Sequence, residues 1–389
     1  MSWPRKICLG DAIRVKHGFA FKGQYFSDSG EYIILTPGNF NEEGGFRLRP
    51  GKDRFYIGDI PEDYILDEGD LLIAMTEQGV GLLGSSALIP EGGKYLHNQR
   101  LGLIQDIDQS VLDKKFLYYL FNTKQVRGQI SGSATGTKVK HTAPERIYRV
   151  KVSIPADVAE QRRIGAILSA YDDLIENNRR RIALLEQAAR LLYKEWFVHL
   201  RFPGHEHVRV MDGVPEGWKR VQVKDVLEKL NRPKKIKQSE YLPEGPIPCV
   251  DQSRDFIGGY TYDEDAVIDI GRSVIVFGDH TRILKYVDFP FACGADGTQL
   301  IISNDPAVSQ EFLYFALDAI DLTNYFYARH FKFLKDQFIP RPNEAILSQF
   351  TDIVRPTLNQ IKLLRAHCER LAKARDMLLP RLMNEEIVV

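Results

Sequence analysis

Two glycine-rich segments contain residue types with which a backbone could cradle phosphates. Gly79 to Gly84 matches the G-x-G-x-x-G pattern of dinucleotide-binding proteins, and Gly132 to Lys138 superficially resembles a P-loop. The first pattern requires a helix that begins at the glycines, but the strand-like SSALIPEGG follows here. In the second segment the spacing is wrong, and Thr137 precedes Lys138 instead of following it. We therefore expect a glycine-rich loop at Gly79 to Gly84 and no nucleotide site in either segment.

Acidic and histidine side chains that could act as catalysts or metal ligands are also poorly arranged. His205-Glu206-His207 has no cysteine nearby, which favours a surface linker over a metal site. Asp172 and Asp173 are adjacent on a predicted helix, so they point to different faces. The sequence has no Ser/His/Asp or Cys/His nucleophile pattern, and no Asn/Asp-Pro-Pro-aromatic segment, which an adenine methyltransferase would require. It therefore predicts a chain that is not an enzyme and holds no metal.

Basic residues gather in three segments of a chain whose formal net charge is zero. The segments are residues 131–151, where Glu145 is the one acidic residue, residues 232–237 and residues 329–335. Local basic patches on a neutral body are compatible with specific phosphate contacts. Solvated surface lysines remain the alternative for any one patch, and zero net charge counts against a nonspecific nucleic-acid binder.

Composition places the chain among ordinary globular proteins. Its 389 residues predict two or three domains, and 44% hydrophobic residues suit buried cores. The longest apolar runs, such as Val274 to Phe277, are too short to cross a bilayer, and the N-terminus lacks the apolar stretch of a signal peptide. The four cysteines are scattered, which is typical of reduced thiols. We expect a cytoplasmic location.

The elements that must position these residues occur twice along the chain. Trp3 to Ile13 aligns with Trp218 to Leu227, and Ile65 to Met75 aligns with Val267 to Phe277. Lys114 to Leu120 similarly aligns with Gln310 to Ala316, and each copy then reaches Ile-Pro and a long helical pattern. A repeat of roughly 190 residues is too long for a solenoid, so each copy is large enough for a domain. Two similar units can contact two similar targets at a fixed separation.

Each copy has the pattern of a mixed α/β domain. Strands are predicted at 32–35, 70–75 and 100–105 in the first copy, and at 273–278 and 299–303 in the second. One helix is predicted in each copy, at 114–123 and at 310–319. The fold class is therefore α+β.

Two long helices with heptad spacing follow the two domains. Mostly apolar residues alternate at intervals of four and three, which is the a/d seam of a coiled coil with a left-handed supercoil. Asn178 and Arg375 are polar seam residues, and such residues commonly fix the register of the helices. The seam residues are Ile164, Leu168, Tyr171, Ile175, Asn178, Ile182, Leu185, Ala189, Leu192 and Trp196 in the first helix, and Phe350, Val354, Thr357, Ile361, Leu364, Cys368, Leu371, Arg375, Leu378 and Leu382 in the second.

The ends and the pairing of these helices can also be predicted. Asp157 and Glu160 resemble a capping box, and Pro356 should kink the second helix or mark its start. A domain between the helices can carry the chain back, so we expect an intramolecular antiparallel pair, about 60 Å long. The alternative is that each helix packs on a partner protein or on another copy of itself.

This order of elements resembles the DNA specificity subunit of type I restriction–modification enzymes. Four segments are similar to that family: Leu9 to Gly23, Ile65 to Met75, Ser153 to Ile182 and Leu371 to Ile387. The resemblance covers essentially the whole chain, and its most specific parts are the two helical regions. The second helix departs from the first, because Ser348–Gln349 stands where the first has Glu160–Gln161.

The resemblance implies a division of the chain and a function for each part. Residues 1–156 would form a first target recognition domain, 157–200 a central spacer helix, 201–342 a linker with a second target recognition domain, and 343–389 a C-terminal spacer helix. Each domain would read one half of a split, asymmetric DNA site, and the helices would set the spacing and hold two modification subunits in a pseudo-two-fold arrangement. S-adenosylmethionine would be bound by those partners, and ATP and magnesium by a further restriction subunit that translocates and cuts DNA, so this chain would need no cofactor.

Residues that could contact DNA occupy matching positions in the two copies. Direct readout uses arginine or lysine to guanine, asparagine or glutamine to adenine, and short hydroxyls. The candidates in the first copy are Thr76, Gln78, Ser133, Thr135, Thr137, Lys138 and Lys140. In the second copy they are His280, Thr281, Arg282, Arg329, His330 and Lys332. A solvated loop is the alternative for each. For the whole chain, the alternative is an adaptor with two protein-binding domains on a coiled coil, which would show no sequence-selective DNA binding.

Overall fold

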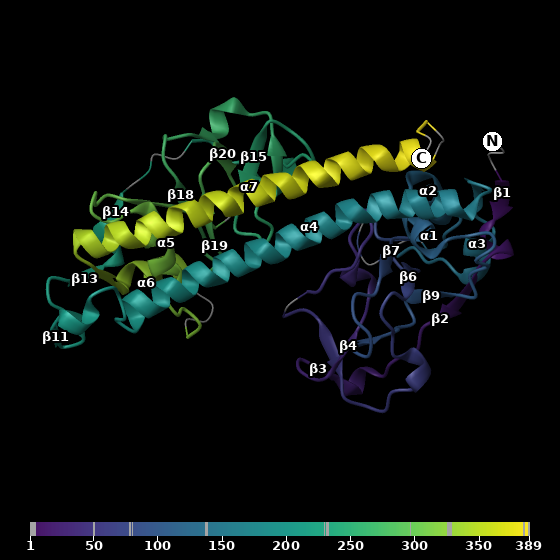
Figure 1. The fold of residues 1–389 in the computed structure, drawn as a ribbon, viewed down its shortest axis with the longest axis horizontal. Helices are drawn as coiled ribbons and strands as arrows, with labels where there is room; N and C mark the ends of the chain where they lie inside the picture. Colours follow the sequence, from purple (N-terminus) through teal and green to yellow (C-terminus); the bar gives the residue numbers. More distant parts are fainter. Residues whose placement is uncertain are drawn as a thin grey trace. The chain divides into compact units, whose positions relative to one another are not determined.

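The chain forms two compact units in the computed structural model. The structure describes residues 5–49, 51–77, 79, 81–136, 139–228, 230, 233–295, 297–324, 329–383 and 386–387. Unit 1 comprises Met1–Asn177 and His367–Val389, and unit 2 comprises Asn178–Ala366. The boundaries fall within the two long helices, α4 (Val158–Tyr193) and α7 (Glu344–Met383), which are teal and yellow in Figure 1. Each unit therefore contains a globular part and a segment of both helices.

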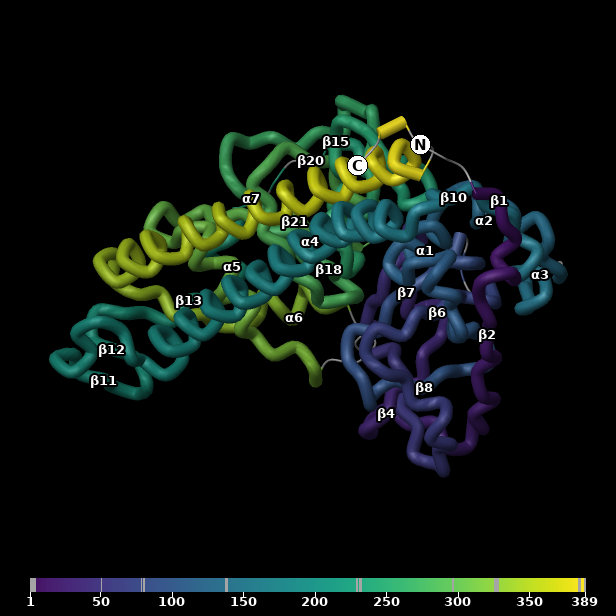
Figure 2. The backbone as a smooth tube through the Cα atoms, turned by 45° about the vertical axis from the view of Figure 1, so that its right-hand side comes forward, coloured from purple at the N-terminus to yellow at the C-terminus, as the bar shows by residue number. Residues whose placement is uncertain are grey.

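The globular part of unit 1 contains two four-stranded sheets. In the first the order is β2 (Arg14–His17), β9 (Leu101–Gln105), β6 (Leu71–Ala74), β7 (Ser86–Leu88), and all neighbours are antiparallel. In the second the order is β3 (Phe26–Ser27), β5 (Arg54–Tyr56), β4 (Tyr32–Ile34), β8 (Tyr95–Leu96), with β4 and β8 parallel. A separate pair joins β1 (Arg5–Cys8) to β10 (Lys151–Ile154), which lie together in Figure 2.

Three short helices complete this globular part. They are α1 (Lys114–Phe121), α2 (Lys124–Gly132) and α3 (Pro144–Tyr148). The Asp113 carboxylate accepts a hydrogen bond from the Phe116 N–H, and the Thr123 hydroxyl accepts one from the Val126 N–H, which satisfies the first amides of α1 and α2. Residues 116–121 of α1 are all buried, so this helix joins the largest core of the unit.

Unit 2 repeats the strand order of the first of these sheets, and it also contains a second mixed sheet. One sheet has the order β14 (Leu227–Glu228), β21 (Thr298–Ser303), β18 (Val274–Gly278), β19 (Leu284–Val287), all antiparallel. The other has the order β16 (Gly259–Thr261), β15 (Ile247–Val250), β20 (Phe291–Cys293), β17 (Val267–Ile268), with β15 and β20 parallel. The remaining elements are the pair β13 (Lys219–Gln222) and β22 (Phe338–Arg341), the hairpin β11 (Val210–Met211) and β12 (Val214–Pro215), and the helices α5 (Gln310–Asp318) and α6 (His330–Asp336).

The correspondence between the two units extends to single residues. The sequence alignment pairs Ile65 with Val267. Ile65 forms an antiparallel bridge to Leu96 in β8, and Val267 pairs antiparallel with Ala292 in β20. Each of the two residues therefore makes the same kind of contact in its own unit.

The predicted strands and short helices are observed, with small shifts at their ends. The strands are β4, β6, β9, β18 and β21, and the helices are α1 and α5. The mixed α and β content is therefore confirmed. The sequence indicated these elements well because their buried runs are flanked by turn residues.

The ends of the long helices differ from the prediction in three ways. The Asp157 carboxylate accepts from the Ala159 N–H at 2.8 Å, one residue earlier than a capping box with Glu160 requires. The α-helical part of α4 stops at Tyr193, and Lys194–Val198 is π-helical. Helix α7 begins at Glu344, with Asn343 accepting from the Ile346 N–H, and so it runs through Pro356. The prediction that Pro356 marks the helix start is wrong.

Within each unit the segments of α4 and α7 run in opposite directions. In unit 1, Asp172 bonds to Arg375 at 2.5 Å, and the Ile175 carbonyl accepts from Cys368 Sγ at 3.7 Å. As the residue numbers rise along α4, the numbers of the contacting residues in α7 therefore fall. In unit 2, Glu186 bonds to Arg365 at 2.6 Å, and Trp196 lies 6.0 Å from Phe350 between ring centroids, which gives the same direction.

The predicted seam residues lie on the covered side of these helices. Eight aliphatic seam residues are buried: Ile164, Leu168, Ile175, Ala189, Val354, Ile361, Leu364 and Leu382. The other aliphatic and tyrosine seam residues are half-buried: Tyr171, Ile182, Leu185, Leu192, Leu371 and Leu378. Leucines off the seam are exposed, with Leu184 at 64% and Leu191 at 52%. Near the ends of the helices the seam joins the globular cores, since Ile164 and Leu168 belong to the same cluster as Phe116.

Candidate functional site

In unit 1 the predicted contact residues converge from two segments. Thr76 follows strand β6, and its hydroxyl lies 3.1 Å from Nδ1 of His141. The Thr135 N–H donates to the His141 carbonyl at 3.0 Å, and the His141 N–H donates back at 2.7 Å. The segments after β6 and after α2 therefore meet at His141. His141 is not among the predicted contact residues, although it lies in the basic segment 131–151.

The side chains around His141 differ in their exposure and in their hydrogen bonds. Lys140 and Thr135 are exposed, and Arg146 donates to the Thr135 hydroxyl at 2.8 Å. Ser133 caps the end of α2 and donates to the Ile130 carbonyl at 3.1 Å. Thr76 is only 7% exposed, which suits it to orient His141 rather than to reach a ligand. The predicted contact residues Gln78, Thr137 and Lys138 lie outside the described residues.

In unit 2 the corresponding segments also meet. Asp279 follows strand β18 and is 4% exposed. Its carboxylate accepts from the Phe331 N–H at 2.8 Å, and its carbonyl accepts from the backbone N–H of His330 at 3.1 Å. The carbonyl also lies 2.8 Å from Nδ1 of His330, whose ring is buried. Asp279 and His330 therefore fix the loop, while Arg329 and Lys332 remain exposed beside it.

The loop after β18 is held in an unusual backbone conformation. Arg282 has φ of 63°, which is uncommon for a residue with a side chain. Its guanidinium donates to the Leu322 carbonyl at 3.0 Å, and the Thr281 hydroxyl donates to the Gln252 carbonyl at 2.7 Å. The His280 N–H donates to the Gln252 side chain at 3.2 Å. Strain of this kind is often concentrated at functional loops.

Sequence reasoning missed two residues that hold the candidate loops. Gln252, in the loop after β15, fixes both His280 and Thr281. In unit 1, Arg127 of α2 donates to the carbonyls of Leu83 at 3.0 Å and Glu42 at 2.7 Å, and also to that of Gly81. Burial lowers the pKa of the Arg127 guanidinium. Neither residue belongs to a motif, so only the fold reveals them.

The motifs set aside on sequence grounds behave as loops. The segment that contains Gly79, Gly81 and Gly84 leads into strand β7, not into a helix. His205–His207 forms one 3-10 turn, and Nδ1 of His205 lies 2.9 Å from the Phe202 carbonyl. Within the described part of the chain, no group of three or more His, Cys, Asp or Glu side chains is placed to hold a metal. Across the same residues, no helix is both long and apolar enough to cross a membrane.

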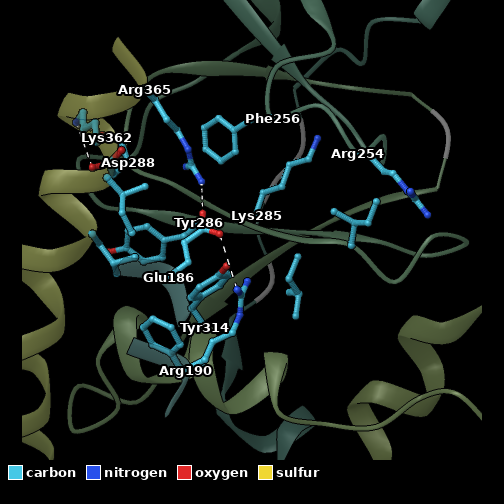
Figure 3. Close-up of a pocket in the computed structure, with 15 residues that line it drawn as sticks. Glu186, Arg190, Arg254, Phe256, Lys285, Tyr286, Asp288, Tyr314, Lys362 and Arg365 are labelled. Carbon is cyan, nitrogen blue, oxygen red and sulfur yellow. Dashed lines mark hydrogen bonds and ion pairs between the residues drawn. The ribbon is translucent and has the colours of Figure 1, made fainter. Parts of the chain in front are cut away.

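A cavity in unit 2 is lined mainly by charged and aromatic side chains (Figure 3). Its volume is about 200 Å³. Glu186 of α4 lies between Arg365, at 2.6 Å, and Arg190, at 3.8 Å, and Arg190 reaches Asp318 at the end of α5, at 2.8 Å. The Arg365 guanidinium also stacks 3.9 Å from the Phe256 ring centre. These contacts join the helices to the globular part of unit 2, and we interpret the cavity as a structural junction.

Comparison with known proteins shows which proteins the chain is similar to. Residues 3–187 match the family model described as the Type I restriction modification DNA specificity domain. The chain is 25% identical over 301 residues to the Type I restriction enzyme MjaIX specificity subunit of Methanocaldococcus jannaschii, covering 71% of this chain and 69% of that protein. It is 21% identical to the MjaVIII specificity subunit of the same organism, covering 88% and 84%.

A solved structure agrees with the fold. The crystal structure of the type I restriction–modification system S subunit from M. genitalium matches with a TM-score of 0.59 and 16% identity, over 98% of this chain and 96% of that chain. Residues 3–187 therefore match a type I restriction modification DNA specificity domain, and most of the chain is similar to type I specificity subunits.

Proposed function

We propose that each globular part reads one half of an asymmetric, bipartite DNA sequence, and that α4 and α7 form the antiparallel coiled coil that sets the gap between the halves. The observation that carries this proposal is the recurrence of the same strand orders, β2-β9-β6-β7 and β14-β21-β18-β19, in the two units. As a specificity subunit the chain recognises DNA and is not itself an enzyme. Methylation and cleavage reside in its partner subunits.

The proposed readers are the loops after β6 and β18 with the segments that meet them. Lys140, Arg329 and Lys332 are exposed cations beside these loops, and exposed Thr135, His280 and Thr281 add hydrogen-bonding groups. Arginine, lysine and short polar side chains are the groups that contact base edges and phosphates. Since these side chains differ between the units, we expect the two half-sites to differ.

The proposed spacer rests on the lengths and contacts of the long helices. Helix α4 has 36 residues and α7 has 40, so each is about 54 to 60 Å long at 1.5 Å per residue. The opposite chain directions in each unit support an antiparallel pair with a pseudo-two-fold axis. Such an axis suits DNA, whose strands are also antiparallel. We propose the domain boundaries 1–156, 157–200, 201–342 and 343–389 on this basis.

We also propose where the modification subunits dock. Leu184, Leu191 and Val198 recur every seven residues on α4 and its continuation, and their exposed fractions are 64%, 52% and 53%. Leu184 and Leu191 lie off the seam, and a heptad row of exposed aliphatic side chains is unusual for a solvated helix face.

We propose that S-adenosylmethionine is bound by the modification subunits, and ATP with magnesium by a restriction subunit.

A map of methylated adenines tests the proposed function. It would be compared between cells with and without this chain, each supplied with the modification subunits. We expect chain-dependent methylation at a split motif with two different halves separated by unread bases. Chain-dependent methylation at a continuous motif would contradict the proposal, and so would a map that does not depend on this chain.

A further inference from the structure

A groove in unit 1 lies between the segment 38–52 and the glycine-rich loop after β6. Its volume is about 740 Å³, and Gly79 and Leu82 form part of its wall. The opposite wall carries three cationic side chains, Arg47, Arg49 and Lys52, and two acidic ones, Glu42 and Glu43, also line the groove. None of these cations belongs to the basic segments that the sequence analysis selected.

The backbone that carries these cations is held by an internal network. Asn39 is 2% exposed, and its amide donates to Asp53 Oδ1 at 2.8 Å while its carbonyl oxygen accepts from the Thr36 N–H at 3.0 Å. Asp53 Oδ2 accepts from the Arg49 N–H at 2.7 Å. The Asp53 carboxylate therefore binds an amide on each oxygen, and it is not paired with a guanidinium. A rigid loop of this kind presents its side chains at low entropic cost.

The three cations have no acidic partner. Among the described residues, Arg47, Arg49 and Lys52 form no ion pair. Arg47 donates from Nε to the Gly38 carbonyl at 3.1 Å, and a Cβ on Gly38 would lie 2.2 Å from Nη1 of Arg49. The absence of a side chain at Gly38 therefore leaves room for the Arg49 guanidinium against the backbone. Arginines packed in this way keep their planar donor groups available for an anion.

Arg127 holds the two walls of the groove together. Its guanidinium binds Glu42 on one wall, and Gly81 and Leu83 on the other, as described above. The second wall belongs to the loop that begins with Thr76, which contacts His141. The cationic wall is thus fixed in position beside the proposed reading loop of the same unit.

We propose that this groove binds the phosphodiester backbone of the DNA half-site read by unit 1, with Arg49 and Lys52 as phosphate contacts. The proposal rests on the proposed function. Guanidinium groups bind phosphate oxygens through paired donors, and phosphate contacts fix the register in which neighbouring loops read bases.

The test uses the complex assembled with the modification subunits and a duplex that contains its methylation site. DNA affinity is measured from 50 to 300 mM salt for wild type and for Arg49→Ala with Lys52→Ala. Near 0.1 M salt we expect the variant to bind DNA about tenfold more weakly for each lost contact. The slope of log affinity against log salt concentration should decrease in magnitude by about two. Both changes should be the same for specific and for unrelated DNA. Arg54→Ala with Lys94→Ala removes two exposed cations that are paired with Asp28 and Glu91, and should change neither quantity.

Three results would overturn the assignment. If wild type binds its site selectively and the groove variant keeps the same DNA affinity and salt slope, the groove is not a phosphate site. The proposed function would then still stand. A loss confined to one base position would make the groove a base reader instead of a phosphate site. No selective binding by the wild-type complex would overturn the proposed function and the groove with it. Circular dichroism of each variant separates these results from misfolding.

Discussion

At the scale of single residues, His97 shows how burial fixes a protonation state. The ring is fully buried, and its Nε2 lies 2.9 Å from the Leu101 carbonyl, while Nδ1 has no partner. Burial lowers the pKa of His97 to about 4, although the bond to Leu101 acts in the opposite direction. The native protein therefore holds this ring neutral at pH 7, inside unit 1 and apart from the reading loops.

The neutral His97 ring makes the stability of unit 1 dependent on pH. The pKa is about 6.5 when unfolded and about 4 when folded, so the unfolded chain takes up a proton first as the pH falls. Stability is fully present above pH 6.5 and decreases by about 3 kcal/mol on approaching pH 4. Urea unfolding at pH 7 and pH 4.5 should show this loss in wild type and a smaller loss in His97→Gln. Equal losses in both proteins would contradict the assignment to His97.

Single residues were also where sequence reasoning was weakest. The basic segment 131–151 includes His141, but the sequence could not show that Thr76 is buried against this histidine. Arg127 and Gln252 were missed because each bonds to partners that are distant in sequence. Side-chain roles of this kind depend on tertiary contacts, and residue type alone does not encode them.

At the scale of elements, a charged cluster ties the two long helices to α1 in unit 1. Asp172 accepts from the Tyr119 hydroxyl at 2.5 Å and from Arg375 at 2.5 Å. Burial opposes the charge on Arg375, but Asp172 and Asp376 outweigh it, and the pKa of Arg375 is raised. A polar seam residue was expected here to fix register, and this cluster supplies a partner for it.

Removing the Asp172 carboxylate from this cluster should lower the free energy of unfolding. Asp172→Asn leaves the half-buried Arg375 with a weaker partner, and we expect unit 1 to lose about 1 to 3 kcal/mol in urea unfolding. Asp173→Asn is the matched control, because Asp173 is exposed on another face of the same helix. If the two variants lose the same stability, the cluster does not hold the helices.

The exposed leucine row on α4 gives a second prediction at this scale. Leu184→Glu with Leu191→Glu should prevent assembly with the modification subunits, measured by size-exclusion chromatography, and should leave thermal unfolding of the isolated chain unchanged. Met211→Glu, at an equally exposed position in β11, should assemble normally. Normal assembly of the leucine variant would exclude this face as the docking surface.

The elements were largely predictable, because their signals are local and repeated. Buried runs between turn residues located strands such as β6 and β18, and the interval of four and three residues located α4 and α7. The exceptions are ends and caps. Pro356 is a strong helix breaker, but it lies inside α7, where the neighbouring residues Val354 and Ile361 are buried.

At the scale of the whole molecule, the proposed function requires the two long helices to set the gap between the half-sites. Each unit contains a segment of α4, a segment of α7 and one globular part, and one sheet has the same strand order in both units. The proposed pseudo-two-fold arrangement places one reader at each end of a helical pair. Half-site centres about one turn of DNA, roughly 34 Å, apart are within the span of such a pair.

Changing the length of both helices tests this claim most directly. One heptad would be inserted after Ile182 and a second after Leu364, where contacts such as Glu186 to Arg365 show the helices to be opposed. Seven residues add about 10 Å of helix, which corresponds to about three base pairs at 3.4 Å each. The methylated motif should keep both half-sites, with a gap about three base pairs longer. An unchanged gap with both half-sites intact would contradict the account.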